Sequence, residues 1–107
     1  MEDVDKRQQV VLSLEPGEEL SYVHNYTINP GKSYELRNDC SYDILWVVEG
    51  GGSLKYAGTI TSLKCGQTVH IPGRQEYSLH SNSVSAMVVE LYGVNVPLAR
   101  EDDVEGE

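Results

Sequence analysis

The segment Gly66-Gln67-Thr68-Val69-His70-Ile71-Pro72-Gly73 carries the clearest structural pattern in this chain of 107 residues. Between the leading glycine and the closing Pro-Gly pair, polar and apolar residues alternate, which is typical of a strand with one buried face. Val69 and Ile71 take the buried face, so we expect His70 to point to solvent. The segment therefore predicts a β-strand that ends at a tight turn.

Short apolar runs between turn signals extend this pattern over most of the chain. Turn residues stand at 15–17, 29–31, 50–52 and 64–66, and no window shows apolar residues at helical spacing over three turns. So many short antiparallel strands must close on themselves or form two facing sheets, which predicts an all-β jelly-roll barrel. The expected strands are Gln9–Leu14, Leu20–Ile28, Ser33–Arg37, Ile44–Glu49, Ser53–Ala57, Thr59–Leu63, Thr68–Ile71, Glu76–His80 and Ser85–Tyr92.

Acidic residues gather at both ends of the chain. We expect a flexible acidic N-terminus at 1–8, one barrel domain at 9–98 and an acidic tail at 99–107. The net charge of −9 argues against nucleic-acid binding, which depends on clustered Lys and Arg. Solubility is one interpretation of this charge, and an acidic surface that meets a basic protein partner is the other.

The sequence also bears on the compartment. No stretch has the length of a membrane span, and the first ten residues lack the basic start and apolar block of a signal peptide. We therefore expect a cytoplasmic protein without a membrane partner. In that compartment Cys40 and Cys65 are expected to be two reduced thiols.

Two segments resemble the cupin superfamily, and more closely the cupin domain of type II phosphomannose isomerases and mannose-1-phosphate guanylyltransferases. The first runs from Thr27 to Gly51, with a Pro-Gly turn, then Leu36, then Trp46-Val47-Val48. The second is the segment from Gly66 to Gly73, followed by Tyr77-Ser78-Leu79. The resemblance implies a small cupin barrel, also called a double-stranded β-helix.

The resemblance also implies where a metal site would stand. Cupins hold a divalent metal with two histidines two residues apart, then a glutamate, then a last histidine. The matching positions in this chain are Arg37, Asp39, Ile44 and Tyr77, or Asp43 in place of Ile44 if the register shifts by one. No histidine stands at any of them, so we expect no metal and no other cofactor.

Five residues are candidates for a binding pocket. They are Arg37, Asp39, Asp43, Tyr77 and Arg74. If the register is right, Arg37 and Tyr77 point into the barrel, where an unpaired charge is very costly. Arg37 is then either tied to an internal acid or holds the phosphate or carboxylate of a ligand. Arg74, in the turn after the strand, either borders the pocket or is solvated.

These observations favour a metal-free cupin that binds a small anionic or sugar-like molecule or another protein. The alternative is a metal-independent sugar isomerase or epimerase that uses His or Tyr as acid and base. A further alternative is a small acidic inhibitor of the kind that viruses encode. We also expect a homodimer, because the strand expected at 9–14 is able to add to the sheet edge of a second copy.

Overall fold

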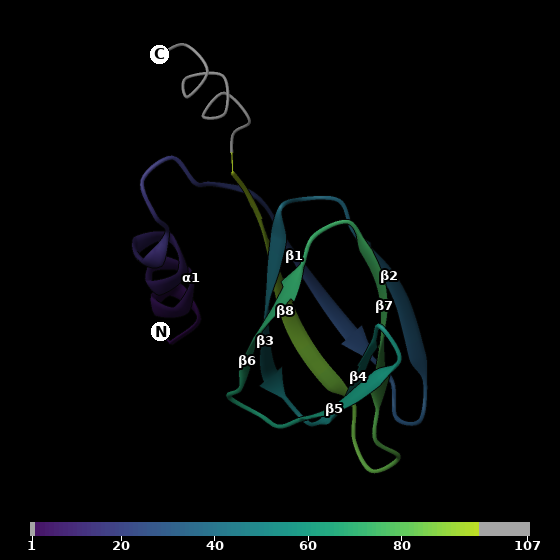
Figure 1. Ribbon diagram of the computed structural model, residues 1–107. Helices are drawn as coiled ribbons and strands as arrows, with labels where there is room; N and C mark the ends of the chain where they lie inside the picture. Colours follow the sequence, from purple (N-terminus) through teal and green to yellow (C-terminus); the bar gives the residue numbers. More distant parts are fainter. Residues whose placement is uncertain (1, 97–107) are drawn as a thin grey trace.

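The computed structural model describes residues 2–96, and the acidic tail expected at 99–107 lies outside this range. The described residues form one helix and eight strands (Figure 1). Eight of the nine expected strands are confirmed, with ends that differ by at most a few residues. The elements are α1 Glu2–Ser13, β1 Glu19–Ile28, β2 Ser33–Asn38, β3 Tyr42–Glu49, β4 Gly52–Tyr56, β5 Thr59–Leu63, β6 Thr68–Pro72, β7 Gln75–Ser81 and β8 Met87–Asn95.

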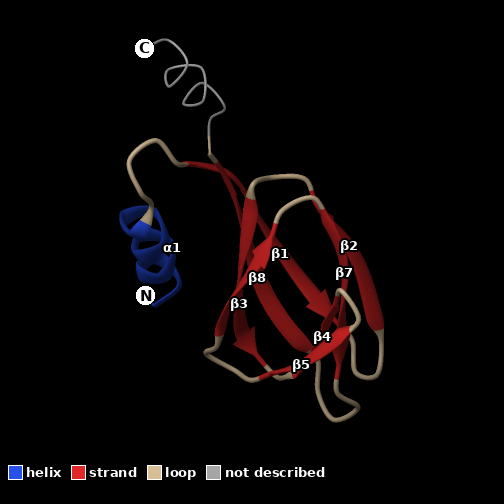
Figure 2. Ribbon diagram, viewed as in Figure 1, coloured by secondary structure: helices blue, strands red, loops and turns tan. Residues whose placement is uncertain are grey.

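The strands of residues 2–96 form two antiparallel sheets that face each other (Figure 2). The first sheet has the order β1-β8-β3-β6, and the second has the order β2-β7-β4-β5. Consecutive strands alternate between the sheets, except for the hairpin of β4 and β5. This alternation is the jelly-roll arrangement, so the predicted all-β barrel is confirmed.

The space between the sheets is filled mainly by aliphatic side chains. Those with no exposed surface come from both sheets: Leu45 and Val47 from β3, Leu79 from β7, and Met87 and Val89 from β8. Each such side chain contributes roughly 1.5–3 kcal/mol through the removal of apolar surface from water. The burial of these side chains therefore holds the two sheets together.

The helix α1 replaces the strand expected at 9–14, and the domain boundary expected after residue 8 falls inside it. Strong helix formers such as Arg7, Gln8 and Gln9 favour this conformation. Val10 is buried and Leu14 is partly buried against the outer face of the first sheet. Because this packing stabilises a helix that is too short to be stable alone, the strand prediction was wrong. The proposed strand exchange between two copies loses its basis.

A tight hairpin joins β4 to β5. Its two central residues, Ala57 and Gly58, have φ angles of 53° and 80°, as a type I′ turn requires. Gly58 adopts this conformation without strain, whereas Ala57 has a side chain that disfavours it. The turn matters for function because it forms one end of the groove described below.

Two further expectations concern the cysteines and the membrane. Cys40 is buried, Cys65 is exposed, and both are free thiols. Among residues 2–96 there is no helix with the length and hydrophobicity to cross a membrane.

Candidate functional site

The strand β2 decides which of the predicted site residues face the barrel interior. Leu36 is half-buried and Asn38 is fully buried, whereas Arg37 and Asp39 are exposed. Because side chains alternate along a strand, Leu36 and Asn38 take the interior positions expected for Arg37 and Asp39. The prediction that Arg37 points into the barrel was therefore wrong by one residue.

Asp43 and Tyr77 do meet inside the barrel. Asp43 on β3 has no exposed surface, and Tyr77 on β7 is 4% exposed. The Tyr77 hydroxyl donates to Oδ2 of Asp43 at 3.2 Å, and the Tyr22 hydroxyl donates to Oδ1 at 2.7 Å. Both carboxylate oxygens are thus engaged by phenols. Of the two residues considered for the carboxylate position, Asp43 lies in the interior, whereas Ile44 packs on the outer face of the first sheet.

Burial controls the electrostatics of this cluster. It raises the pKa of the Asp43 carboxyl, although the hydrogen bonds from Tyr22 and Tyr77 act in the opposite direction. It also raises the pKa of both phenols, and the neighbouring Asp43 raises them further. The two hydroxyls therefore remain protonated donors at physiological pH.

Asn38 has a structural role beside this cluster. Its amide donates to the carbonyls of Ile71 and Pro72, both at 3.0 Å, and its Oδ1 accepts from the backbone N–H of Cys40 at 2.9 Å. These bonds tie the end of β2 to the end of β6. Because the polar side-chain atoms of Asn38 all bond to the backbone, they are not available to a ligand.

A row of aromatic rings lies along β1 and β2, which are edge strands of the two sheets. The ring of Tyr22 stacks on His24 at 4.7 Å between centroids, and His24 lies 6.1 Å from Tyr26. Tyr26 in turn lies 5.0 Å from Tyr34 of β2. This row links the two edge strands by side-chain packing, and Tyr22 connects it to Asp43.

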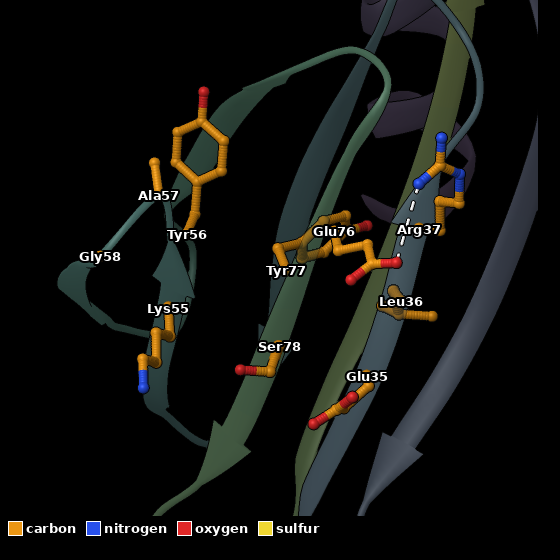
Figure 3. Close-up of a pocket in the computed structure, with 10 residues that line it drawn as sticks. All are labelled: Glu35, Leu36, Arg37, Lys55, Tyr56, Ala57, Gly58, Glu76, Tyr77 and Ser78. Atoms are coloured by element: carbon orange, nitrogen blue, oxygen red, sulfur yellow. Dashed lines mark ion pairs between the residues drawn. The ribbon is translucent and has the colours of Figure 1, made fainter.

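A groove of about 470 Å³ lies on the outer face of the second sheet (Figure 3). Strand pairing sets Lys55, Ser78 and Glu35 side by side across β4, β7 and β2, and in Figure 3 they point the same way. The hairpin residues Ala57 and Gly58 border the groove at one end. The groove is polar because these positions face away from the core.

Arg37 also lines this groove, and its charge is balanced on the surface. Its Nε donates to Oδ1 of Asp39 at 2.9 Å, and its Nη1 lies 3.7 Å from Oε2 of Glu76. The side chains of Arg37 and Asp39 are 55% and 76% exposed, so such a pair is worth about 1 kcal/mol or less. Arg74 is exposed in the turn between β6 and β7 and does not line the groove.

Comparison with solved structures identifies this architecture. A cupin 2 conserved barrel protein from Rhodopseudomonas palustris matches with a TM-score of 0.58 at 13% identity, over 84% of this chain and 72% of its own. The cupin_2 domain of an XRE family transcriptional regulator from Enterobacter cloacae matches with a TM-score of 0.59 at 14% identity, over 75% of this chain and 95% of its own. The chain has the cupin fold.

A further match is a predicted oxalate decarboxylase from Thermotoga maritima. It has a TM-score of 0.62 at 13% identity, over 73% of this chain and 68% of its own. At the level of sequence, no protein family and no curated protein matches the chain. At these identities the solved structures establish the fold of the chain, and its activity has to be argued from its own side chains.

The side chains in the interior of the barrel do not fit a metal ion. At or directly beside the four positions that the resemblance matched to metal ligands, the interior side chains are Leu36, Asn38, Asp43 and Tyr77: an apolar group, an amide bonded to the backbone, a carboxylate and a protonated phenol. First-row metals prefer imidazole, thiolate and carboxylate donors, and among these four positions only Asp43 supplies one. Within residues 2–96, no group of three or more His, Cys, Asp or Glu is arranged to hold an ion.

Two important residues of the site escaped sequence reasoning. Tyr22 belongs to the interior cluster and Lys55 to the outer groove. Tyr22 alternates with His24 and Tyr26 on a strand, which signalled a shared face but not its partner. No sequence pattern distinguishes Lys55 from other surface lysines. The pairing of β4 with β7, which sets Lys55 beside Ser78, places it in the groove.

Proposed function

We propose that this chain is a metal-independent cupin that acts as a binding domain and not as a sugar-phosphate isomerase. The observation that carries the proposal is the state of Asp43, whose two oxygens accept hydrogen bonds from Tyr22 and Tyr77. These phenol hydroxyls stabilise the carboxylate without a cation. Aldose–ketose isomerisation in the phosphomannose isomerases that the sequence resembles depends on such a metal.

The alternative of a metal-independent isomerase or epimerase finds less support. It needs a side chain that exchanges protons with bound substrate at a pKa near the working pH. Tyr77 is buried, its hydroxyl is bonded to Asp43, and burial raises the pKa of its phenol far above neutrality. The expected acid–base residue is therefore better suited to supporting the barrel.

We assign the ligand to the outer groove of the second sheet. Its charged lining consists of Arg37, Lys55, Glu35 and Glu76, so two cations face two acids. Arg37 is already paired, which leaves Lys55, Ser78 and Glu35 as the main hydrogen-bonding groups. Because both donors and acceptors are present and the charges balance, a neutral, hydroxyl-rich molecule such as a sugar fits better than an anion.

Ligand-observed NMR with a panel of neutral sugars and their phosphates tests this assignment. We expect saturation transfer to at least one neutral sugar, and loss of the signal in Lys55→Met and Glu35→Gln. Ser62→Ala, on the neighbouring strand and outside the groove lining, is the matched control. Binding of sugar phosphates alone would overturn the charge argument and favour the anionic ligand.

Metal independence is tested separately by elemental analysis of the purified protein. We expect far less than one Zn, Fe, Mn, Ni or Co per chain, and no change in melting temperature after chelation, because no bound ion contributes to folding. One tightly held metal per chain would overturn the proposal. The cytoplasmic location and the homodimer stay predictions, and light scattering against the chain mass of 11.9 kDa tests the dimer.

A further inference from the structure

A trough runs between α1 and the outer face of the first sheet, on the side of β6. It consists of two depressions of about 200 Å³ and about 380 Å³, which share Ser13 and His70 in their linings. The trough belongs to the first sheet, whereas the groove proposed for a small ligand lies on the second. The two sites therefore have different residues and different chemistry.

One end of the trough is apolar. Val10 of α1 lines it together with Ile44 and Trp46 of β3, and Thr68 of β6 borders the same depression. Trp46 is 9% exposed, so a little of its surface remains within reach of a ligand. Aromatic residues in partly covered pockets are favourable anchor points for a binding partner.

The other end of the trough is acidic. Glu15 and Glu18, from the segment between α1 and β1, line it with Tyr42. Oε1 of Glu18 accepts from the Tyr42 hydroxyl at 3.1 Å and from the backbone N–H of Glu15 at 2.8 Å. Oε2 of Glu18 makes no hydrogen bond to the side chains that the structure describes, those of residues 7–96. Among the described side chains neither depression has a Lys or Arg in its lining, and His70 is the one basic side chain there.

The spacing of the two ends follows from the strands beneath them. Trp46 pairs with Thr68, and Tyr42, four residues before Trp46 on β3, pairs with Pro72. Four residues of a strand span about 13 Å. An extended peptide laid along the trough would therefore bring side chains i and i+4 to its two ends, on the same side of the peptide.

We infer that the trough binds an extended basic segment of a partner protein, with an apolar residue followed four positions later by Lys or Arg. The apolar side chain packs beside Trp46, and the cation meets Glu15 and Glu18. Charge complementarity selects this occupant. The chain's own segment 97–107 carries five acids and one Arg, and a second copy carries a net charge of −9, so both are repelled.

The lone tryptophan of the chain provides the measurement. We would titrate the protein with the peptide acetyl-Gly-Leu-Ser-Thr-Ser-Lys-Gly-amide, which has no tryptophan of its own, and follow Trp46 emission. The control peptides replace Leu by Ser or Lys by Glu. We expect a saturable change with the first peptide, at least roughly tenfold weaker binding of each control, and weakening of the binding by added salt.

Protein variants locate the binding. Glu15→Lys places a cation at the acidic end and should weaken the Leu/Lys peptide by roughly tenfold. Glu49→Lys makes the same charge change at an exposed position outside both linings, and should leave binding nearly unchanged. Unchanged far-ultraviolet circular dichroism of both variants shows that they are folded.

Three outcomes would overturn the inference. One is a Leu/Lys peptide that binds no tighter than its control peptides, and another is equal weakening by Glu15→Lys and Glu49→Lys. The third is a concentration-dependent change in Trp46 emission without peptide, matched by a dimer mass in light scattering. That result would assign the trough to a second copy of the chain.

Discussion

The two sheets share one apolar interior but have opposite outer faces. On the first sheet Ile44, Trp46, Tyr92 and Val94 point outward and are buried, with Val10 of α1 packed against them. On the second sheet the outward side chains are mostly polar, with the exposed Ile60 of β5 as an apolar exception, and Figure 3 shows the lysine, serine and glutamate among them open to the groove. Figure 1 shows α1 beside the strands of the first sheet and away from β2 and β7.

This difference teaches how the sequence divides its surface between stability and binding. β3 is buried at five consecutive positions, from Asp43 to Val47, so both of its faces need a cover. β7 alternates between covered and open positions, so only one of its faces belongs to the core. The first sheet therefore contributes a second layer of packing, and the second sheet presents polar groups to the solvent.

The largest expected effect comes from removing a side chain of the covered face. Trp46→Ala leaves a cavity between α1 and the first sheet and should lower the free energy of unfolding by roughly 3–5 kcal/mol. Lys55→Ala on the open face should change it by about 0.5 kcal/mol or less. Urea unfolding followed by circular dichroism measures both. Equal losses in the two variants would abolish the contrast between the faces.

The buried acid of the interior should give the next largest effect. Asp43→Ala leaves the hydroxyls of Tyr22 and Tyr77 without their acceptor, which should cost roughly 2–4 kcal/mol. Asp43→Asn keeps the shape and an acceptor oxygen, so its loss should be much smaller. The same urea experiment compares them. A larger loss in the Asn variant would mean that the charge, and not the acceptor, stabilises the barrel.

Most of the fold was predictable because strand alternation and turn residues are local signals. The exception is α1, and the reason lies in the run from Ile44 to Val48. That run indicated a strand buried on both faces, but the residues that bury its outer face come from a segment distant in the sequence. Val10 and Leu14 are spaced for one side of a helix, a signal that is weak when only two such residues are present.

The candidate site was predictable in part. Asp43 and Tyr77 follow from the cupin resemblance, whereas the Arg37 position failed because Leu36, the apolar neighbour, takes the interior. Tyr22 depended on a contact that spacing does not reveal. It pairs with Gly93, where an added Cβ would lie 2.3 Å from the Tyr22 ring. The ring reaches Asp43 by crossing a residue without a side chain.

A smaller effect concerns the pH dependence of stability. Because burial raises the pKa of Asp43 in the folded protein, its stabilising contribution is complete below the unfolded-state pKa of about 3.9 and is lost as pH rises through the folded-state pKa. The melting temperature of the wild type relative to Asp43→Asn should therefore fall as pH rises from acid toward neutral. Asp39→Asn, at an exposed position, is the control. A difference that grows with pH would contradict the raised pKa.

The smallest effect is expected from Arg37→Met on the open face. Were Arg37 inside the barrel and paired there, its loss would cost roughly 3–5 kcal/mol. Its partners Asp39 and Glu76 lie at the surface with it, so we expect a change of about 0.5 kcal/mol or less. Leu36→Ala, one residue away and facing the core, should cost roughly 2 kcal/mol or more and is the matched control. Thermal melts of both variants test which side chains of β2 face the core. If Arg37→Met lost as much stability as Leu36→Ala, the guanidinium would have to lie in the interior.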